Sequence, residues 1–235
     1  MNDFKTVNLL GINFTKANEG EILEFITKGL RKGQEKYYVV TPNPELLVIA
    51  SGNPEYKRVL NGAKLALPDG IGVVLASKLL GNPIKQRITG VDLTENLCRE
   101  ISKKRVTAAF LGAGPKIAEL TAECLQKKYP GLKVSWVSEE WSSDLSYKPV
   151  DVLFVAFGSP KQEIWINKNL QNLPVKVAIG VGGAFDFISG SVPRAPKFLR
   201  SLGLEWLFRL IIQPWRIRRQ LSLIKFVFLV FKEKL

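Results

Sequence analysis

The chain has 235 residues, no histidine and a net charge of +13 at pH 7. A hydrophobic fraction of 46% and a charged fraction of 23% allow a sizeable core and exclude a disordered chain. Without histidine, and with two cysteines that lack metal-ligand spacing, Cys98 and Cys124, the sequence argues against a zinc or haem site. The first residues lack a basic region followed by a long apolar stretch, so we expect no signal peptide and a cytoplasmic location.

Segments of strand length alternate with helical patterns along most of the chain. Asn18, Asn43 and Asn53 each stand where a helix is expected to begin, and a proline follows the last two at the favoured first helical position. Asp92 is expected to cap a further helix. The segments predicted to be strands are 7–14, 37–41, 64–70, 106–114, 132–137, 151–159 and 175–183. This alternation predicts an α/β fold, a mostly parallel, Rossmann-like sheet with helices on both faces.

Ligands bind beyond the carboxyl ends of the strands in such sheets. That rule selects the loops 41–45, 68–70, 112–115, 158–162 and 182–186. Asp69 is the strongest single candidate, because its apolar neighbours should raise its pKa toward values useful for proton transfer. Since Gly70 and Ile71 begin a helix, the alternative role for Asp69 is a helix N-cap, and the two roles are compatible.

Three other loops carry weaker patterns. Gly112 and Gly114 follow a strand and precede a helix, which either places a phosphate at the helix N-terminus or forms only a tight turn. Because the dinucleotide fingerprint is incomplete, an NAD-dependent oxidoreductase is disfavoured. The segment FGSPKQE, with Ser159 and Gln162, forms either a site or an ordinary capped helix. The glycines around Asp186 either admit a ligand close to the backbone or form a mobile loop.

Residues 194–235 differ from the rest in composition, with ten Lys/Arg against two Glu and a net charge of +8. A basic segment of this kind favours an anionic partner. Its pattern is helical with a break at Pro214, and its most apolar stretch, 223–231, is too short to span a bilayer. Aromatic residues and leucines opposite arginines suit a helix in a membrane interface, and a core-packing helix is the alternative. We therefore divide the chain into an α/β catalytic core, 1–193, and a basic, amphipathic helical appendage, 194–235.

Nine segments follow one another from about residue 7 to residue 220: VVTPNPELL, ALPDGIGVV, RITGVDL, FLGAGP, KYPGL, VAFGSPKQE, GVGGAFDFISG, RAPKFLRSLGLEWLFRLIIQP and RR. Together they resemble the WecG/TagA/CpsF family of bacterial glycosyltransferases, most closely its TagA branch. The resemblance implies transfer of N-acetylmannosamine from its UDP derivative to the 4-hydroxyl of undecaprenyl-diphosphate-linked N-acetylglucosamine. The product would be the linkage disaccharide of wall teichoic acid, made without a cofactor.

The resemblance also implies roles for residues of the core. It implies inversion at the sugar carbon C1, with Asp69 as the general base that takes the proton of the acceptor hydroxyl. Thr41, Asn43, Arg87 and Gln162 match pocket residues of the family, and by position they would orient the donor and acceptor sugars.

In the appendage, Arg209, Arg216 and Arg219 match arginines that the family is expected to close over the site. Because the chain has no Asp-x-Asp motif to hold a metal, these arginines would neutralise the departing diphosphate. Their spacing would keep them near one face of a helix, with Arg218 pointing away toward lipid head groups. Strand-end geometry alone places three further candidates near the nucleotide: Gly112, Gly114 and Asp186.

We expect, from this resemblance, a peripheral enzyme on the inner face of the cell membrane. Its partners would be a UDP-sugar donor, a polyprenyl-diphosphate-linked acceptor and an anionic membrane surface, with no nucleic acid and with a homo-oligomer left open. An alternative within the family is a uronic acid donor, whose carboxylate would need an extra cation such as Arg87 or Lys161. An alternative from another class is a basic nucleic-acid-binding protein.

Overall fold

A computed structural model describes residues 4–30, 35–142, 144 and 146–234. At its centre lies a six-stranded sheet with the strand order β4-β3-β8-β7-β5-β6, in which every neighbouring pair is parallel. The strands are β3 (Tyr37–Val40), β4 (Leu65–Ala66), β5 (Thr107–Gly112), β6 (Lys133–Ser138), β7 (Val150–Ala156) and β8 (Val175–Gly180). The predicted α/β fold is confirmed, and the carboxyl ends of all six strands meet at one edge of the sheet.

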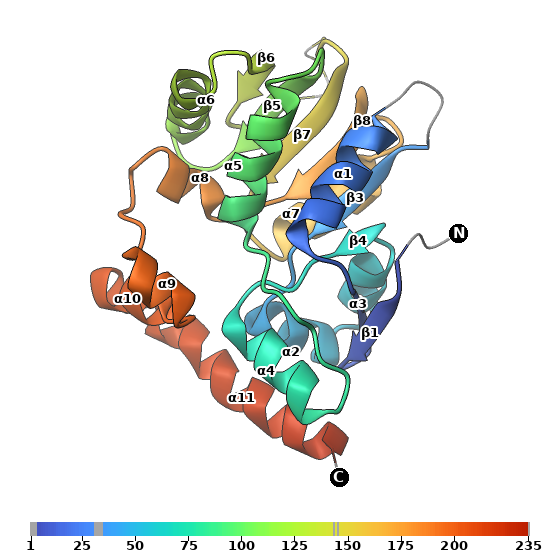
Figure 1. Ribbon diagram of the computed structural model, residues 1–235, viewed down its shortest axis with the longest axis vertical. Coiled ribbons are helices and arrows are strands. Elements are labelled where there is room, and N and C mark those ends of the chain that lie inside the picture. Colours follow the sequence, from blue (N-terminus) through green and yellow to red (C-terminus); the bar gives the residue numbers. More distant parts are fainter. Residues whose placement is uncertain (1–3, 31–34, 143, 145, 235) are drawn as a thin grey trace.

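Helices cover both faces of this sheet, and each face has its own hydrophobic core (Figure 1). Successive strand residues point to opposite faces, so that Val39 packs in one core and Val40 in the other. The helices over one face are α2 (Pro44–Gly52), α3 (Pro54–Asn61) and α7 (Lys161–Asn169). Those over the other face are α1 (Glu19–Gly29), α5 (Gly90–Ile101) and α6 (Ile117–Lys128).

The N-terminal segment differs from its prediction. Instead of one strand over 7–14, an antiparallel hairpin forms a separate two-stranded sheet from β1 (Thr6–Leu9) and β2 (Ile12–Thr15). Leu10 and Gly11 have φ of 53° and 79°, the left-handed values that a tight two-residue hairpin turn requires. The turn was missed because Leu10 continues the apolar run and hides the break in the strand.

The predicted helix starts are mostly right. Asn18, Asn43 and Asn53 each accept a hydrogen bond from a backbone N–H of the first turn, as N-cap residues do. The prediction for Asp92 was wrong, because α5 begins earlier and Thr89 is its N-cap. The Thr89 hydroxyl oxygen accepts from the backbone N–H of Asp92 at 3.1 Å.

The C-terminal segment runs along the outside of the core as separate helices, and its longest helix packs on α2 and passes α4 (Figure 1). Phe226 and Val230 of that helix are buried, and the Leu10 N–H donates to Glu233 at its end, at 2.9 Å. The break predicted at Pro214 is confirmed. The C-terminal segment consists of α9 (Lys197–Ser201), α10 (Glu205–Ile212), the 3-10 helix η1 (Pro214–Arg216) and α11 (Ile217–Lys234). The remaining two helices of the core are α4 (Ile71–Leu79) and α8 (Ala184–Ile188).

Candidate active site

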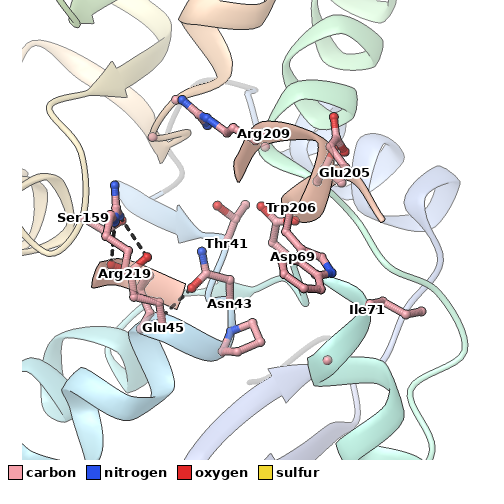
Figure 2. A pocket seen from close by; sticks show the side chains of 18 of the residues that line it. Thr41, Asn43, Glu45, Asp69, Ile71, Ser159, Glu205, Trp206, Arg209 and Arg219 are labelled. Carbon is pink, nitrogen blue, oxygen red and sulfur yellow. Dashed lines mark hydrogen bonds and ion pairs between the residues drawn. The ribbon is translucent and has the colours of Figure 1, made fainter. Parts of the chain in front are cut away.

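A cavity of about 760 Å³ lies where the carboxyl ends of the strands meet α4, α10 and α11 (Figure 2). It occupies the edge of the sheet that the strand-end rule selects. Nine of the residues chosen from the sequence line it: Thr41, Asn43, Asp69, Arg87, Gln162, Asp186, Arg209, Arg216 and Arg219. Core and C-terminal segment therefore contribute to one cavity.

Asp69 and Trp206 both line this cavity (Figure 2). Burial raises the pKa of the Asp69 carboxyl to about 7. The positive charge of Arg87 opposes that shift, and the negative charge of Glu205 adds to it. A carboxyl with this pKa is ionised for a large part of the time near neutral pH and binds a proton far more strongly than an ordinary aspartate.

The backbone around Asp69 tests its candidate role as a helix N-cap. The Asp69 N–H donates to the carbonyl of Pro42 at 3.0 Å, which ties the end of this loop to the segment after β3. Gly70 is the N-cap of α4, has a φ of 92°, and no side chain caps the helix. The Asp69 carboxylate therefore does not cap α4; it lines the cavity, and a hydrogen bond from the backbone of Gly90, at the start of α5, partly offsets the rise in its pKa.

Thr41 and Asn43 follow β3 and point into the cavity beside Asp69 (Figure 2). The Thr41 hydroxyl donates to the carbonyl of Gly180 at 3.2 Å, which holds the ends of β3 and β8 together. The Asn43 side-chain oxygen accepts from Leu46 N–H as the cap of α2. Since the oxygen is committed to the cap, the amide nitrogen is the part of Asn43 that can donate to a ligand.

Gln162 is buried at the start of α7 and holds the glycine-rich loop after β8. Its side-chain oxygen accepts from the Gly182 N–H at 3.0 Å, and its nitrogen donates to Glu163 at 2.8 Å. Glu163 also accepts from the hydroxyls of Ser159 and Tyr56. Burial raises the pKa of Glu163, and the hydrogen bonds it accepts partly offset that shift. Gln162 thus lines the cavity and also shapes its wall.

The sequence predicts Ser159 as the cap of α7 and Lys161, Gln162 and Glu163 facing the cleft from its first turn; of these three only Gln162 lines the cavity, and Glu163 is fully buried behind it. α7 begins at Lys161, and the Ser159 hydroxyl donates to Glu163 at 2.6 Å instead of capping the helix. The position of Glu163 in the first turn was therefore predicted, but its burial was not. Its burial depends on Tyr56, which lies on another helix and more than a hundred residues away in the chain.

Three arginines of the C-terminal segment gather at the cavity. Arg209 pairs with Asp186 at 3.0 Å and lies 4.6 Å from the centre of the Phe187 ring. Arg219 forms two hydrogen bonds with Glu45, at 2.8 and 2.9 Å (Figure 2).

Arg216 forms no ion pair with any carboxylate in the described part of the chain. Burial, together with repulsion from Arg209 and Arg219, lowers the pKa of Arg216 to about 10. A cluster that includes a half-buried arginine without an ion-pair partner among the described residues is suited to bind an anion.

The three arginines come together through three separate elements, and not on one helix face as predicted. Arg209 lies on α10, Arg216 in η1 and Arg219 on α11, so they do not share one helix face. Pro214 breaks the helix between them, and the chain turns so that all three reach the cavity. Arg218 is exposed and does not line the cavity, as expected.

Ion pairs connect the core to α9 and α10 beside Asp69. Arg194 pairs with Asp92 at 2.6 Å and with Glu205 at 3.2 Å, and Arg87 reaches Glu205 at 3.9 Å. Sequence reasoning selected Arg87 but missed Arg194 and Glu205. Their partners lie far away in the chain, and no local pattern marks them.

The two glycines of the 112–115 loop do not lie among the described residues that line the cavity, whereas Ala113 between them does. Gly112 has a φ of 104°, and a side chain there would come within 2.9 Å of the backbone of Ala156. Gly112 therefore allows β5 to pack closely on the end of β7. Lys161, one cation named for a uronic acid donor, also lies outside the lining and stands over the Phe157 ring.

In the part of the chain that the structure describes, no helix is both long and apolar enough to cross a membrane. In the same residues, no three His, Cys, Asp or Glu side chains come together in a way that could hold a metal ion.

Comparison with known proteins finds relatives that align with nearly the full length of the chain. The model of the "Glycosyl transferase WecG/TagA/CpsF family" matches residues 7–235. The N-acetylglucosaminyldiphosphoundecaprenol N-acetyl-beta-D-mannosaminyltransferase of Bacillus spizizenii is 40% identical over 84% of this chain and 79% of its own. Proteins of the same name from Bacillus subtilis and Staphylococcus aureus are 33% and 31% identical, over 98% and 97% of this chain and 93% of their own.

Proposed function

This chain belongs to the WecG/TagA/CpsF family of glycosyltransferases, and from that premise we propose that it transfers N-acetylmannosamine from UDP to N-acetylglucosamine on undecaprenyl diphosphate. The acceptor and the transferred sugar are those in the printed names of relatives that align with most of the chain. The observation that carries the proposal is one cavity that holds a carboxylate with a raised pKa and three arginines. The product would be the linkage disaccharide of wall teichoic acid.

The proposed reaction is a single displacement with inversion at C1 of the donor sugar. The acceptor hydroxyl oxygen forms the new bond to C1 as its proton passes to the Asp69 carboxylate. The bond between C1 and the diphosphate oxygen breaks, and UDP leaves with that electron pair from the opposite face. The raised pKa of Asp69 supports this role, because a base is most effective when its pKa lies near the working pH.

Arg209, Arg216 and Arg219 would neutralise the charge that develops on the leaving diphosphate. Arg216 is the strongest candidate for direct contact, since it has no carboxylate partner among the described residues. The other two are held in place by Asp186 and Glu45. Arginine suits this task because its planar, permanently charged group donates two parallel hydrogen bonds to phosphate oxygens.

The remaining cavity residues would orient the two sugars. Asn43 offers an amide donor beside Asp69, while Thr41 and Gln162 fix the strand ends that form the cavity wall. Arg87 is held by the carbonyl of Arg200 and by Glu205, so it can contact a sugar without moving far.

We place the enzyme on the inner face of the cell membrane as a peripheral protein, because its acceptor is a lipid. Support comes from α11, which exposes a row of apolar side chains at helical spacing: Ile217, Leu221, Ile224 and Phe228. Basic residues next to this row, Arg218 and Lys225, are also exposed and would meet anionic head groups.

The test is a transfer assay with the purified chain, UDP-N-acetylmannosamine and a lipid-diphosphate-N-acetylglucosamine acceptor in the presence of EDTA. Formation of a disaccharide on the lipid and release of UDP are expected. A matched reaction with the uronic acid donor reports the other activity of the family. No product with UDP-N-acetylmannosamine would contradict the proposal, and loss of the product in EDTA would contradict the role given to the arginines.

A further inference from the structure

The cavity extends past the polar residues at Asp69 and the arginines into an apolar groove between α4 and α11. The α4 side of the groove consists of residues one and two turns apart: Ile71, Leu75 and Leu79. The α11 side has the same spacing: Leu223, Val227 and Phe231. The two helices thus present parallel apolar rows to one groove, which is continuous with the candidate catalytic residues.

Four of these six groove residues are exposed, Leu75, Leu79, Val227 and Phe231, whereas Ile71 and Leu223 are half-buried. Leu75 is 55% exposed, Val227 50% and Phe231 53%. Phe226 and Val230, the neighbours that attach α11 to the core, are buried. The groove is therefore not needed to hold α11 in place, and a contiguous apolar surface of this kind indicates an apolar ligand.

α11 carries two distinct apolar rows. The outer row, Ile217, Leu221, Ile224 and Phe228, does not contribute to the described lining of the cavity. The inner row, Leu223, Val227 and Phe231, does. A helix that only lies on a membrane needs one apolar face. The second row has no such use, because it faces α4 across the groove.

We propose that the groove between α4 and α11 binds the polyprenyl chain of the acceptor over the isoprene units nearest the diphosphate. This inference rests on the proposed function, and it adds where the lipid lies. The ligand must be apolar along one part and anionic next to it, because the groove opens directly onto Arg209, Arg216 and Arg219. A prenyl diphosphate has this distribution, whereas a second copy of the chain would have to place an acidic group beside its apolar contact.

The groove also explains how a membrane-bound hydroxyl could reach Asp69. With the outer row of α11 in the bilayer, the inner row offers the chain a continuous apolar path from the lipid to the cavity. α4 has nine residues and is ~13 Å long, so it can contact only the first part of an undecaprenyl chain. The rest of the chain would stay in the membrane.

Kinetics in detergent micelles test this, with undecaprenyl and farnesyl forms of the N-acetylglucosamine diphosphate acceptor and a form that carries only a methyl group. The groove variant is Leu75→Gln with Val227→Gln. The control, Leu120→Gln with Ile164→Gln, changes exposed apolar residues outside the groove, on α6 and α7. We expect the groove variant to raise KM for both prenyl acceptors by about tenfold or more. Its KM for the methyl acceptor and for the UDP-sugar should match that of the control.

Equal KM values for groove variant and control with the prenyl acceptors would overturn the proposal. So would an equal rise in KM for the methyl acceptor, because the defect would then lie in the polar part of the cavity. A groove variant that abolishes a concentration-dependent dimer in sedimentation, with no change in KM, would assign the surface to self-association instead.

Photo-cross-linking separates this inference from the proposed function, because it needs no turnover. A farnesyl diphosphate with a photoreactive group on its chain should label peptides of α4 and α11 in the wild type, and unlabelled undecaprenyl diphosphate should compete. Labelling without sugar transfer would contradict the proposed reaction and keep the groove. Transfer with labelling elsewhere would overturn the groove alone.

Discussion

The core and the C-terminal segment reach the same cavity, but they are held there by different forces. Asp69 sits in a loop tied by backbone hydrogen bonds, next to strands that are buried on both faces. The three arginines lie on elements with few buried side chains, and among the described residues ion pairs hold Arg209 and Arg219 but not Arg216. The comparison indicates that the proposed base, Asp69, is preformed in the core, whereas the cluster of arginines depends on docking of the C-terminal segment.

Removal of residues 195–235 separates the two regions most completely, because it deletes nearly all of the C-terminal segment. The truncated core keeps all eight strands and the helices on both faces of the sheet, so we expect a native-like circular dichroism spectrum. It loses the three arginines and the groove, so transfer to a lipid acceptor should fall to background. Full activity of the truncated chain would contradict the role of the arginines.

Arg216→Ala tests the cation cluster without removing the fold. Arg216 has no carboxylate partner in the described chain, so its loss leaves no unpaired charge behind. We expect kcat to fall about 100-fold, the scale of one lost hydrogen-bond donor to a developing anion. The matched control is Arg218→Ala, an exposed neighbour outside the cavity, which should keep the wild-type kcat in detergent.

In the core, the buried carboxyl of Asp69 should make the stability of the fold depend on pH. The folded-state pKa of Asp69 is raised to about 7 from 3.8, so its ionised form destabilises the fold. Stability should therefore fall as the pH rises from about 4 to 7. Asp69→Asn removes this cost and should increase the free energy of unfolding by about 1–3 kcal/mol at pH 8. Denaturant unfolding should show the gain disappear near pH 4, and a gain that is equal at both pH values would contradict the burial argument.

Glu205 allows the smallest and most specific test, because it belongs to the C-terminal segment but acts on the core. Its negative charge helps to raise the pKa of Asp69. In Glu205→Gln that contribution is lost, so the rising limb of the pH–rate profile should move to lower pH, by less than about one unit. An unchanged profile with an unchanged kcat would show that docking of α10 does not tune the base.

The sequence predicted the core side of the site better than the C-terminal side. Thr41, Asn43 and Asp69 follow strands, so one rule about parallel sheets placed them together. The partners of Asp92 and Glu163 could not be found in this way. Their ion pairs and hydrogen bonds join positions about a hundred residues apart, to Arg194 and Tyr56, and depend on packing that no local pattern encodes.

The appendage shows a second limit of sequence reasoning. Helical spacing put Arg209, Arg216 and Arg219 on one face, but three separate elements bring them together. The sequence correctly indicated a break at Pro214, yet a break does not define the direction that the chain takes afterwards. The groove was likewise invisible, since the two rows of α11 are distinguished only by the presence of α4 beside one of them.

The most direct measurement is the rate of sugar transfer by Asp69→Asn under saturating UDP-N-acetylmannosamine and lipid acceptor at pH 8, with UDP affinity measured in parallel. Loss of the general base should lower kcat by about 10²–10⁴-fold, while the affinity for UDP stays at the wild-type value. A kcat within about twofold of the wild type would contradict the assignment of Asp69 as the base, and with it the account of how this cavity works.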